Sequence, residues 1–416
     1  MKIDDKMSLK SPSLRFPEFT GEWEKCKVSD LLDFYPTNSL SWDKLEYGTN
    51  AIQNLHYGLI HVGLPTMVDL SKDKLPNVVN GNTPKNYELC QEGDVAFADA
   101  SEDTNEVAKA VEFYNLNGNK AICGLHTIHG RDNHQRTIVG YKGYAFSSIS
   151  FHHQIRRIAQ GTKIYSINCK NFSECYVGIP SKEEQSKIAT LLRLIDERIA
   201  VQSRLIEDLK KFKCAIVENV LNNRHPRMIR LGDIGSYIRG LTYSSNDVVE
   251  QNGTFIMRSN NIVNGCSLDY YNDVVSVNKR ISKEQMLQNG DIIICMANGC
   301  SALVGKSSFY DGKCPRSITV GAFCGIYRSE EPIVKWLFQT NRYRRYIWNS
   351  LQGGNGAIAN LNGEDILRMS FPIPDAPVKN NCVKLLTSVD FMIENATSLC
   401  VLYTSQKEYL LRQMFI

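Results

Sequence analysis

Two stretches of the chain place apolar residues alternately three and four positions apart, which predicts long helices that each carry one narrow apolar seam. The first stretch covers 181–221, and its seam consists of Ile188, Leu192, Ile195, Ile199, Ile206, Leu209, Ile216 and Val220. The second covers about 377–415, and its seam consists of Cys382, Leu386, Val389, Ile393, Ala396, Cys400, Tyr403, Leu410 and Met414. A repeat of about 3.5 residues is typical of left-handed coiled coils, so we expect the two helices to pack on each other.

The two helical stretches also match each other position by position. Three pairs share one offset of 194 residues: Pro180 with Pro374, Asp196 with Asp390, and Ile199 with Ile393. Lys213 interrupts the first seam, and Lys407 interrupts the second seam at the same offset. We therefore predict that these two lysines occupy equivalent layers of one helix pair. The alternative is that each helix packs back on its own domain.

The segments that precede the helices are rich in predicted strands. Apolar or β-branched runs alternate with Gly, Asn and Asp, as in EGDVAFAD, RTIVGYKGYAFSSISF and ECYVGIP of the first segment, and this predicts short strands joined by turns. The second segment repeats the pattern with GDIIICMA, SITVGAFCGIYR and MSFPIP. We predict an α+β fold in which two globular domains of mixed α/β character are each followed by a long helix. The expected parts are a flexible tail (1–13), a first domain (14–180), a first helix (181–224), a second domain (225–374) and a second helix (375–416).

The start of the first helix carries a specific signal. Ser181 follows Pro180, and Glu184 lies three residues further on. This spacing predicts a capping box, in which each side chain bonds the backbone N–H of the other residue. The polar sequence NNRHP at 222–226 is expected to end the same helix.

Composition narrows the class of protein. The chain has 416 residues, of which 43% are hydrophobic and 22% are charged, and its net charge is +4. These values are typical of soluble globular protein. No run approaches the roughly 20 apolar residues that span a bilayer, so we predict no membrane-spanning segment. The N-terminal sequence shows no apolar region of a secretory signal. We interpret the 13 cysteines, which form no CxxC pair, as reduced residues of a cytoplasmic protein.

No motif for catalysis is present. The sequence contains neither GxxxxGK[ST], which grips nucleotide phosphates, nor an (N/D)PP(Y/F) loop, which holds a flipped base for methylation. We therefore predict a chain that is not an enzyme. Two alternatives remain open: an enzyme whose catalytic site is not recognised, and a coiled-coil scaffold that binds only protein.

The sequence GLHTIHGRDNHQR at 124–136 gathers histidines and arginines between two predicted strands. Its histidines are His126, His129 and His134. A zinc site usually includes cysteines, and none lies in this stretch, so we predict no metal. A DNA-facing loop fits the donors better, and an ordinary solvated loop remains the alternative.

Candidate DNA contacts are side chains with donors for bases and phosphates. Arg suits guanine, Asn and Gln suit adenine, and Lys and Arg hold phosphates. The candidates of the first domain are Gln53, Asn54, His56, Lys120, His126, His129, Arg131 and Arg136. The candidates of the second domain are Arg258, Asn260, Asn261, Asn298, Lys306, Arg316, Arg342 and Arg345. RSNN (258–261) takes roughly the place of QNLH (53–56). Solubilising surface residues or buried structural amides are the alternative for each candidate.

Three segments together resemble one known family. They are LRFPEFTGEWE (14–24), CYVGIPSKEEQSKIATLLRLIDERI (175–199) and the weaker copy MSFPIPDAPVKNNCVKLLTSVDFMI (369–393). This order of domain, helix, domain and helix resembles the specificity subunit of type I restriction–modification enzymes. The second copy departs from the pattern, because Pro377, Val378 and Lys379 replace the Glu183, Glu184 and Gln185 of the first copy.

The resemblance implies a division of labour. Each globular domain would be a target-recognition domain that reads one half of a bipartite, asymmetric sequence in double-stranded DNA. The helices would pair antiparallel, set the spacer between the half-sites, and dock two modification (methyltransferase) subunits that methylate adenine at N6. Restriction subunits would add ATP-driven translocation and cleavage. S-adenosylmethionine, ATP and Mg would then be bound by these partner subunits, and this chain would bind no cofactor.

Overall fold

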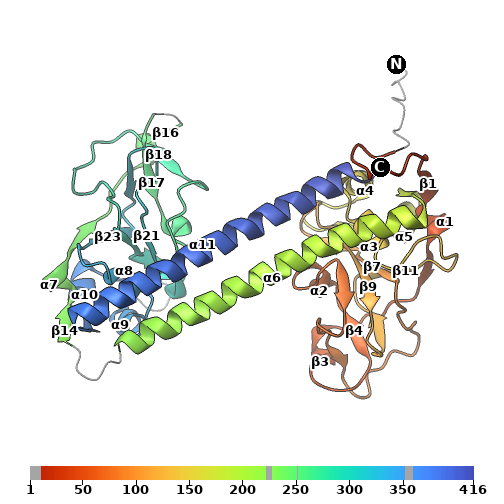
Figure 1. Ribbon diagram of the computed structural model, residues 1–416, viewed down its shortest axis with the longest axis horizontal. Coiled ribbons are helices and arrows are strands. Elements are labelled where there is room, and N and C mark those ends of the chain that lie inside the picture. The colour runs from red at the N-terminus through yellow and green to blue at the C-terminus, as the bar shows by residue number, and fades with distance from the viewer. Residues whose placement is uncertain (1–10, 222–226, 251, 352–358) are drawn as a thin grey trace. The chain divides into compact units, whose positions relative to one another are not determined.

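The computed structural model describes residues 11–221, 227–250, 252–351 and 359–416 (Figure 1). The chain divides into two compact units. Unit 1 comprises the residues up to Ser203 together with Thr397–Ile416, and unit 2 comprises Arg204–Ala396. Each unit therefore contains one globular domain, part of the first long helix and part of the second. The first ten residues of the expected tail and the polar helix stop at 222–226 lie outside the described residues.

Unit 1 contains two main sheets. The larger sheet has the strand order β2 (Asp33–Tyr35), β11 (Thr127–Arg131), β7 (Val95–Ala98), β9 (Ala110–Asn115) and β5 (Met67–Asp69). The smaller sheet has the order β10 (Ala121–Cys123), β4 (Gln53–Leu55), β6 (Asn77–Val78) and β3 (Leu45–Glu46). All four residues of β7 are buried, as expected of a central strand that is covered on both faces.

Two short strand pairs and five short helices complete this domain. The pairs are β1 (Glu24–Lys27) with β13 (Tyr176–Ile179), and β8 (Ala100–Ser101) with β12 (Tyr165–Ser166). The helices are α1 (Val28–Leu31), α2 (Tyr57–His61), α3 (Lys142–Phe146), α4 (Ile149–Ile158) and α5 (Cys169–Ser173). The β1–β13 pair brings the sequence just before the first long helix back to the beginning of the domain.

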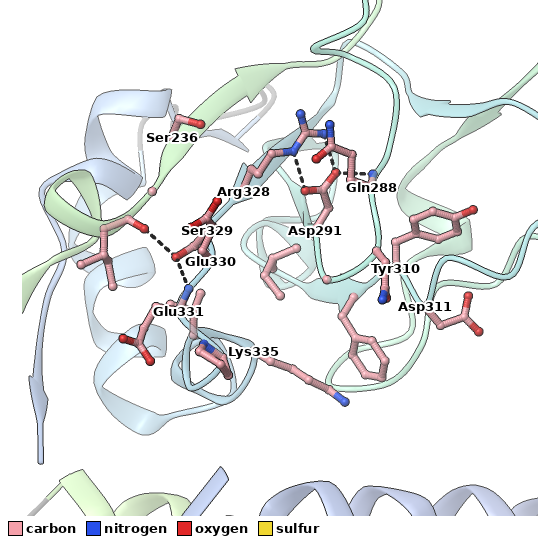
Figure 2. A pocket seen from close by; sticks show the side chains of 18 of the residues that line it. Ser236, Gln288, Asp291, Tyr310, Asp311, Arg328, Ser329, Glu330, Glu331 and Lys335 are labelled. Carbon is pink, nitrogen blue, oxygen red and sulfur yellow. Dashed lines mark hydrogen bonds and ion pairs between the residues drawn. The ribbon is translucent and has the colours of Figure 1, made fainter. Parts of the chain in front are cut away.

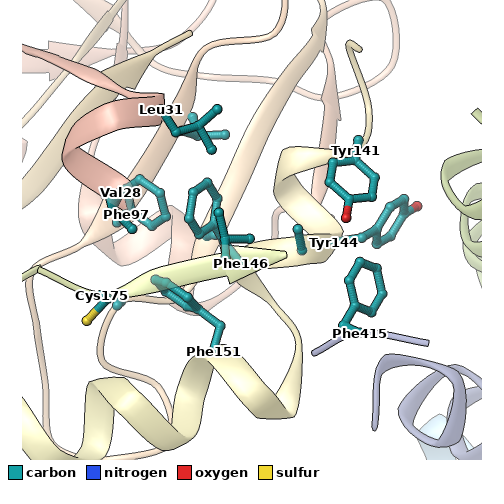
Figure 3. Close-up of a cluster of buried hydrophobic side chains, with 14 of the residues drawn as sticks. Val28, Leu31, Phe97, Tyr141, Tyr144, Phe146, Phe151, Cys175 and Phe415 are labelled. Atoms are coloured by element: carbon teal, nitrogen blue, oxygen red, sulfur yellow. The ribbon is translucent and has the colours of Figure 1, made fainter. Parts of the chain in front are cut away.

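Aromatic side chains fill the core of unit 1 (Figure 3). Phe97 and Phe146 meet edge to face with ring centroids 4.9 Å apart, and Phe151 lies 4.9 Å from Phe146. Phe415, from the end of the chain, packs 6.0 Å from the ring of Tyr141. Such pairs add about 0.5–1.5 kcal/mol beyond the burial of their area. The last residues of the chain are thus part of the first domain's core.

The strand prediction for RTIVGYKGYAFSSISF (136–151) is wrong. This segment contains α3 and the start of α4. Every residue of α3 is buried, so the segment shows no contrast between apolar and polar faces from which a helical period could be read. Ser148 caps α4 by accepting a hydrogen bond from the backbone N–H of Phe151, a signal that the aromatic residues around it obscure.

Unit 2 repeats the same plan. One sheet has the order β15 (Ser236–Arg239), β23 (Cys324–Arg328), β19 (Ile292–Cys295) and β21 (Ser307–Phe309). The other has the order β16 (Val248–Val249), β18 (Val275–Val277), β17 (Thr254–Met257) and β22 (Ile318–Val320). The two-stranded pairs are β14 (Arg227–Arg230) with β25 (Ser370–Ile373), and β20 (Ala297–Asn298) with β24 (Ala359–Asn360). The predicted internal repeat is confirmed for these strands, while β5 of unit 1 has no counterpart among the described strands of unit 2.

Short helices and turns connect these strands. The helices are α7 (Leu231–Ile234), α8 (Val334–Leu337), α9 (Asn341–Ser350) and α10 (Gly363–Leu367). The 3₁₀ turns are η1 (Trp42–Lys44) in unit 1, and η2 (Ser245–Asp247), η3 (Ser259–Asn261) and η4 (Ser301–Leu303) in unit 2.

The two long helices form as predicted, α6 over Lys182–Leu221 and α11 over Ala376–Gln413 (Figure 1). In unit 1, Ile188, Leu192 and Ile195 of α6 join Leu410 of α11 in the domain core. In unit 2, Leu209 of α6 packs with Val389 and Ile393 of α11, flanked by Ile206 and Ile216. The N-terminal part of α6 therefore meets the C-terminal part of α11, and the reverse holds in unit 2. The seams pack on each other, and where they reach a domain they also join its core.

Three further seam residues behave in the same way. Ile199 and Tyr403 pack against the core of unit 1, and Leu386 belongs to the core of unit 2. The predicted capping box at the start of α6 is only half correct. Ser181 Oγ accepts a hydrogen bond from the backbone N–H of Glu184 at 3.3 Å, but the Glu184 carboxylate bonds Arg15 at 2.6 Å.

Helix α11 is long and apolar enough, by length and composition alone, to cross a membrane. The sequence prediction overlooked this. One such helix is by itself weak evidence of a membrane span, and 28% of its most apolar stretch is buried within the structure. Moreover, Asp390 and Lys407 form ion pairs on the face of α11 that meets α6.

Candidate nucleic-acid interface

A cluster of aromatic and imidazole rings lies at the ends of two parallel strands of unit 1. β4 and β10 run parallel with Leu55 opposite Cys123, so the residues that follow them emerge at the same edge of the sheet. His56 stacks 4.5 Å from Trp42 and 4.7 Å from Tyr57. The ring of His126 meets Tyr57 at 5.2 Å. We call Trp42, His56, Tyr57 and His126 the ring cluster.

Each imidazole of the ring cluster is held by a specific partner. His56 Nδ1 accepts a hydrogen bond from the backbone N–H of Gly58, which caps α2. Burial lowers the pKa of His56, and the charge of His126 lowers it further. His126 lies 3.1 Å from Asp99 and is half exposed. The cluster therefore contains one buried and one half-exposed imidazole, together with the exposed indole of Trp42.

The equivalent place in unit 2 is a pocket of about 550 Å³. β17 and β22 run parallel with Met257 opposite Val320, so Arg258 takes the place of His56 and Phe323 takes the place of His126. The pocket is lined by Thr242, Tyr243, Ser244, Ser245, Arg258, Ser259, Asn260, Gly321, Ala322, Phe323 and Cys324. Phe323 is 64% exposed, which is unusual for a phenyl ring. We call these residues the arginine pocket.

Contacts within unit 2 support the arginine pocket. Arg258 Nη2 donates to the backbone oxygen of Asp273 at 3.0 Å. Asn298 Nδ2 donates to Ser259 Oγ at 3.3 Å, so Asn298 lies beside the pocket. Asn260 is exposed. Three of the predicted contacts thus come together: Arg258, Asn260 and Asn298.

Five predicted contacts are buried: His56 of the ring cluster, which is 3% exposed, and four that belong to neither site. His129 and Arg131 both bond Asp94, at 2.7 and 2.9 Å. Asn54 accepts a hydrogen bond from Asn38 at 2.7 Å. Asn261 accepts one from the backbone N–H of Arg258 and is 1% exposed. Each of these side chains bonds a protein partner beneath the surface.

The other candidates lie elsewhere in their domains. Gln53 and the exposed Lys120 are neighbours across β4 and β10, since the backbone N–H of Gln53 donates to the Lys120 oxygen. Arg136 lies 2.5 Å from Glu24, away from the ring cluster. Arg316 donates to the Gly253 oxygen at 3.3 Å.

Three basic candidates of unit 2 lie on α9 or beside it. Lys306 lines a second pocket with Arg344 and Trp348. Arg342 Nε donates to the backbone oxygen of Ser370 at 2.8 Å, while Arg345 is exposed. A basic, partly aromatic surface therefore exists here as well, separate from the lining of the arginine pocket.

Sequence reasoning missed the exposed aromatic residues of both sites. Trp42 is 46% exposed and Phe323 is 64% exposed. Each becomes meaningful only beside its neighbours from other strands, so no local pattern marked them. The sequence VGAF (320–323) carries one signal for such a residue: an aromatic side chain three positions after the end of a buried β-branched strand.

A larger cavity in unit 2, of about 1040 Å³, has a different character (Figure 2). Arg328 within it is neutralised by Asp291, with oxygens 2.7 and 2.8 Å from the guanidinium. Its other charged lining residues are four acidic ones, Asp233, Asp311, Glu330 and Glu331, and two lysines, Lys313 and Lys335. Its charge disfavours phosphates, so we exclude it from the nucleic-acid interface.

Matching ion pairs join the long helices in each unit. In unit 1, Lys407 lies 2.7 Å from Asp196, which also accepts a hydrogen bond from Tyr144. In unit 2, Lys213 lies 3.1 Å from Asp390. Asp390 also accepts from Trp336 Nε1 and lies 2.8 Å from Lys335. The predicted equivalence of Lys213 and Lys407 is therefore confirmed.

The long helices also expose apolar side chains away from their seams. On the unit 1 parts of the helices, these are Leu194, Val201, Leu399, Val401, Leu402 and Tyr409. On the unit 2 parts, they are Leu205, Phe212, Val378, Leu385, Phe391 and Met392. Large exposed apolar surfaces of this kind mark interaction sites in soluble proteins. We call them the outer apolar faces.

Comparison with known proteins gives a consistent result. No protein-family profile matches the chain. Two curated proteins are similar to it: the type I restriction enzyme EcoKI specificity subunit of Escherichia coli K12 and the StySPI specificity subunit of Salmonella potsdam. Each is 32% identical over 149 residues, which is 34% of this chain and 31% of the relative. The chain thus matches about a third of the length of these relatives.

Solved structures extend the likeness over almost the whole chain. The type I restriction–modification S subunit from M. genitalium aligns with a TM-score of 0.60 and 14% identity, covering 98% of this chain and 99% of that one. A chain from a structure of type I R-M complex assembly aligns with a TM-score of 0.53 and 13% identity, covering 94% and 96%.

The fold is that of a two-domain protein with paired long helices, as in type I S subunits. The resemblance to type I specificity subunits, indicated by the sequence motifs, is confirmed.

Proposed function

We propose that this chain is the DNA-recognition subunit of a type I restriction–modification complex, and that each globular domain reads one half of a bipartite, asymmetric target. One observation carries the proposal. The ring cluster and the arginine pocket occupy equivalent positions after parallel strands, yet His56 and His126 stand where Arg258 and Phe323 stand. Equivalent sites with different donors are suited to reading two different half-sites.

The donors at the two sites match different tasks. Arg258 offers the bidentate donor geometry that suits guanine O6 and N7, and Asn260 offers the amide that suits adenine. The exposed rings of Trp42 and Phe323 provide apolar contacts for thymine methyl groups or sugars. Exposed Lys120 and Arg345 suit phosphates, which position the protein on the duplex.

The outer apolar faces support docking of two methyltransferase subunits on the helices. On this proposal, S-adenosylmethionine, ATP and Mg²⁺ are held by the modification and restriction subunits, and this chain supplies no catalytic group. It acts in the cytoplasm, where bacterial DNA lies. The paired helices set the spacer between the half-sites.

The test is a titration of the complex assembled with its modification subunits against duplex DNA carrying the target. The target is found by mapping N6-methyladenine in the host. Arg258→Ala should weaken binding by about 1–3 kcal/mol and relax discrimination at one base pair of one half-site. Arg345→Ala is the matched control, because loss of a phosphate contact should weaken binding to all sequences alike.

Three results would contradict the proposal. If Arg258→Ala alters both half-sites equally, the two domains do not read separate halves. If the assembled complex shows no salt-dependent DNA affinity, the chain is a protein-binding scaffold. Methylation or cleavage of DNA by the chain alone would show that it is an enzyme.

A further inference from the structure

Three buried residues of unit 1 bring metal-ligand atoms together. Cys90, Cys123 and His129 each offer one ligand atom, and these atoms lie within 4.8 Å of one another. Cys90 precedes β7, Cys123 ends β10, and His129 lies in the middle of β11. The exposed fraction of each residue is 6% or less. This buried group is distinct from the surface ring cluster.

The spacing of the two thiols fits a shared ion. Cys90 Sγ and Cys123 Sγ are 3.7 Å apart. Two thiolates at about 2.3 Å from a tetrahedral zinc ion are separated by about 3.8 Å. A disulfide would bring the sulfur atoms to about 2.0 Å. The observed separation matches the first arrangement.

The histidine has one ring nitrogen held by a carboxylate and one without a hydrogen-bond partner. His129 is fully buried, and its Nδ1 has no hydrogen-bond partner. Its other nitrogen, Nε2, lies 2.7 Å from Asp94 Oδ2. A carboxylate on the second nitrogen is the usual support of a metal-binding histidine, because it fixes the ring and increases the basicity of the ligand nitrogen. A buried ring nitrogen without a partner is costly unless something else occupies it.

The second domain provides an internal comparison. β23 pairs with β19 in the same register as β11 pairs with β7, at an offset of 197 residues. Ile326 lies opposite Ile293 in unit 2, and His129 lies opposite Ala96 in unit 1. The offset also relates the pair Asp94–Arg131 to the pair Asp291–Arg328. At this offset Leu287, Val320 and Ile326 replace Cys90, Cys123 and His129, and all three are buried in one apolar cluster.

The comparison shows that the fold does not itself require polar groups at these positions. The same strands close over Leu, Val and Ile in unit 2. The thiols and the imidazole of unit 1 therefore need another explanation. The sequence prediction of no metal rested on the absence of cysteines near His129, but the fold brings them from the end of β10 and from the segment before β7.

We propose that Cys90, Cys123 and His129 bind a zinc ion that joins β10 and β11 to the segment before β7. Thiolate and imidazole ligands favour zinc among the divalent cations, and binding releases two thiol protons. Three protein ligands leave the fourth tetrahedral position for a small ligand. Because Cys123 ends β10, the ion lies directly beneath the turn that presents His126.

The test uses the full chain purified under reducing conditions with zinc supplied during expression. Metal analysis should find about one zinc per chain. The variant Cys90→Leu/Cys123→Val/His129→Ile copies the apolar triad of unit 2, so it should fold and bind at least tenfold less zinc. The matched control is Cys295→Ser. Cys295 is a buried cysteine opposite Cys324 in unit 2, and its replacement should leave the zinc content unchanged.

Cobalt gives a readout that does not depend on any variant. The wild-type chain loaded with Co²⁺ should show thiolate-to-cobalt absorption and the intense visible bands of a tetrahedral site. A chelator should lower the melting temperature of the wild type and leave that of the triple variant unchanged. Zinc-free wild-type protein that also fails to take up Co²⁺, unchanged zinc in the triple variant, or a Cys90–Cys123 disulfide in the reduced preparation would each overturn the proposal.

Discussion

Lys213 of α6 lies 3.1 Å from Asp390 of α11, and the same residue types exchange helices in the Lys407–Asp196 pair of unit 1. Asp390 is the more heavily used acceptor, because Lys335 and Trp336 also bond it. Removing a carboxylate from such a site leaves buried donors without a partner.

We expect Asp390→Ala to lower the free energy of unfolding by about 2–4 kcal/mol. Asp196→Ala should cost less, because its carboxylate bonds only Lys407 and Tyr144 and is more exposed. The measurement is denaturant unfolding followed by helical circular dichroism. Asp208→Ala is the control, since Asp208 and Lys211 form an exposed pair on α6 whose loss should cost under about 1 kcal/mol. Equal losses for all three variants would show that the Lys–Asp pairs between the helices stabilise the protein no more than an exposed pair does.

Phe415 should contribute strongly to the stability of the first domain. Its ring packs edge to face on Trp23 at 6.2 Å and beside Tyr141 at 6.0 Å. Phe415→Ala should therefore lower the free energy of unfolding by about 3–5 kcal/mol, measured by thermal or denaturant unfolding. A loss below about 1 kcal/mol would mean that the chain's last residues do not belong to this core.

Phe391 should matter for assembly with partner subunits and not for the stability of the chain. Its ring is 61% exposed on an outer apolar face of α11. Phe391→Ser should change the stability of the isolated chain by no more than about 0.5 kcal/mol but weaken assembly with the modification subunits. Size-exclusion chromatography of the mixed subunits measures the second effect. Normal assembly of the variant would argue that partners dock elsewhere.

His152 predicts a pH dependence of stability. Burial lowers the pKa of His152 below its ordinary value of 6.5, and the nearby charge of Arg156 lowers it further. The unfolded state therefore takes up a proton near pH 6.5 while the folded state does not, so stability falls as the pH drops below about 6.5.

The variant His152→Gln removes this proton uptake. Between pH 7.5 and pH 5.5, the melting temperature of the wild type should fall further than that of the variant. His134→Gln is the control, since His134 is exposed, and it should follow the wild type. Parallel curves for wild type and His152→Gln would contradict the prediction.

The long helices were predictable because their information is local. A seam such as Ile188, Leu192 and Ile195 shows its period within a few turns, and the matched lysines fixed the layers. The segment 136–151 was not predictable in this way, because burial on every side removes the periodic contrast. Similarly, Cys90, Cys123 and His129 lie on separate segments, and only strand pairing brings them together.

For the candidate DNA contacts as well, the local sequence carried some of the information and the strand pairing carried the rest. Sequence alone selected the positions that lie after β4 and after β17, because donors gather there. It could not separate the half-exposed His126 from the buried His129, since both lie in one polar stretch. Burial depends on the neighbouring strands, and Asp94 comes from 35 residues away.

Each long helix carries one aspartate and one lysine of the two ion pairs that join the helices: Asp196 and Lys213 lie on α6, and Asp390 and Lys407 lie on α11. This is the isologous arrangement of a symmetric homodimer, in which one surface serves as its own complement. One polypeptide thus contains a self-complementary interface. It follows that a fragment holding one domain and α6 carries all the charges needed to pair with a second copy of itself, with Asp196 of each copy facing Lys213 of the other.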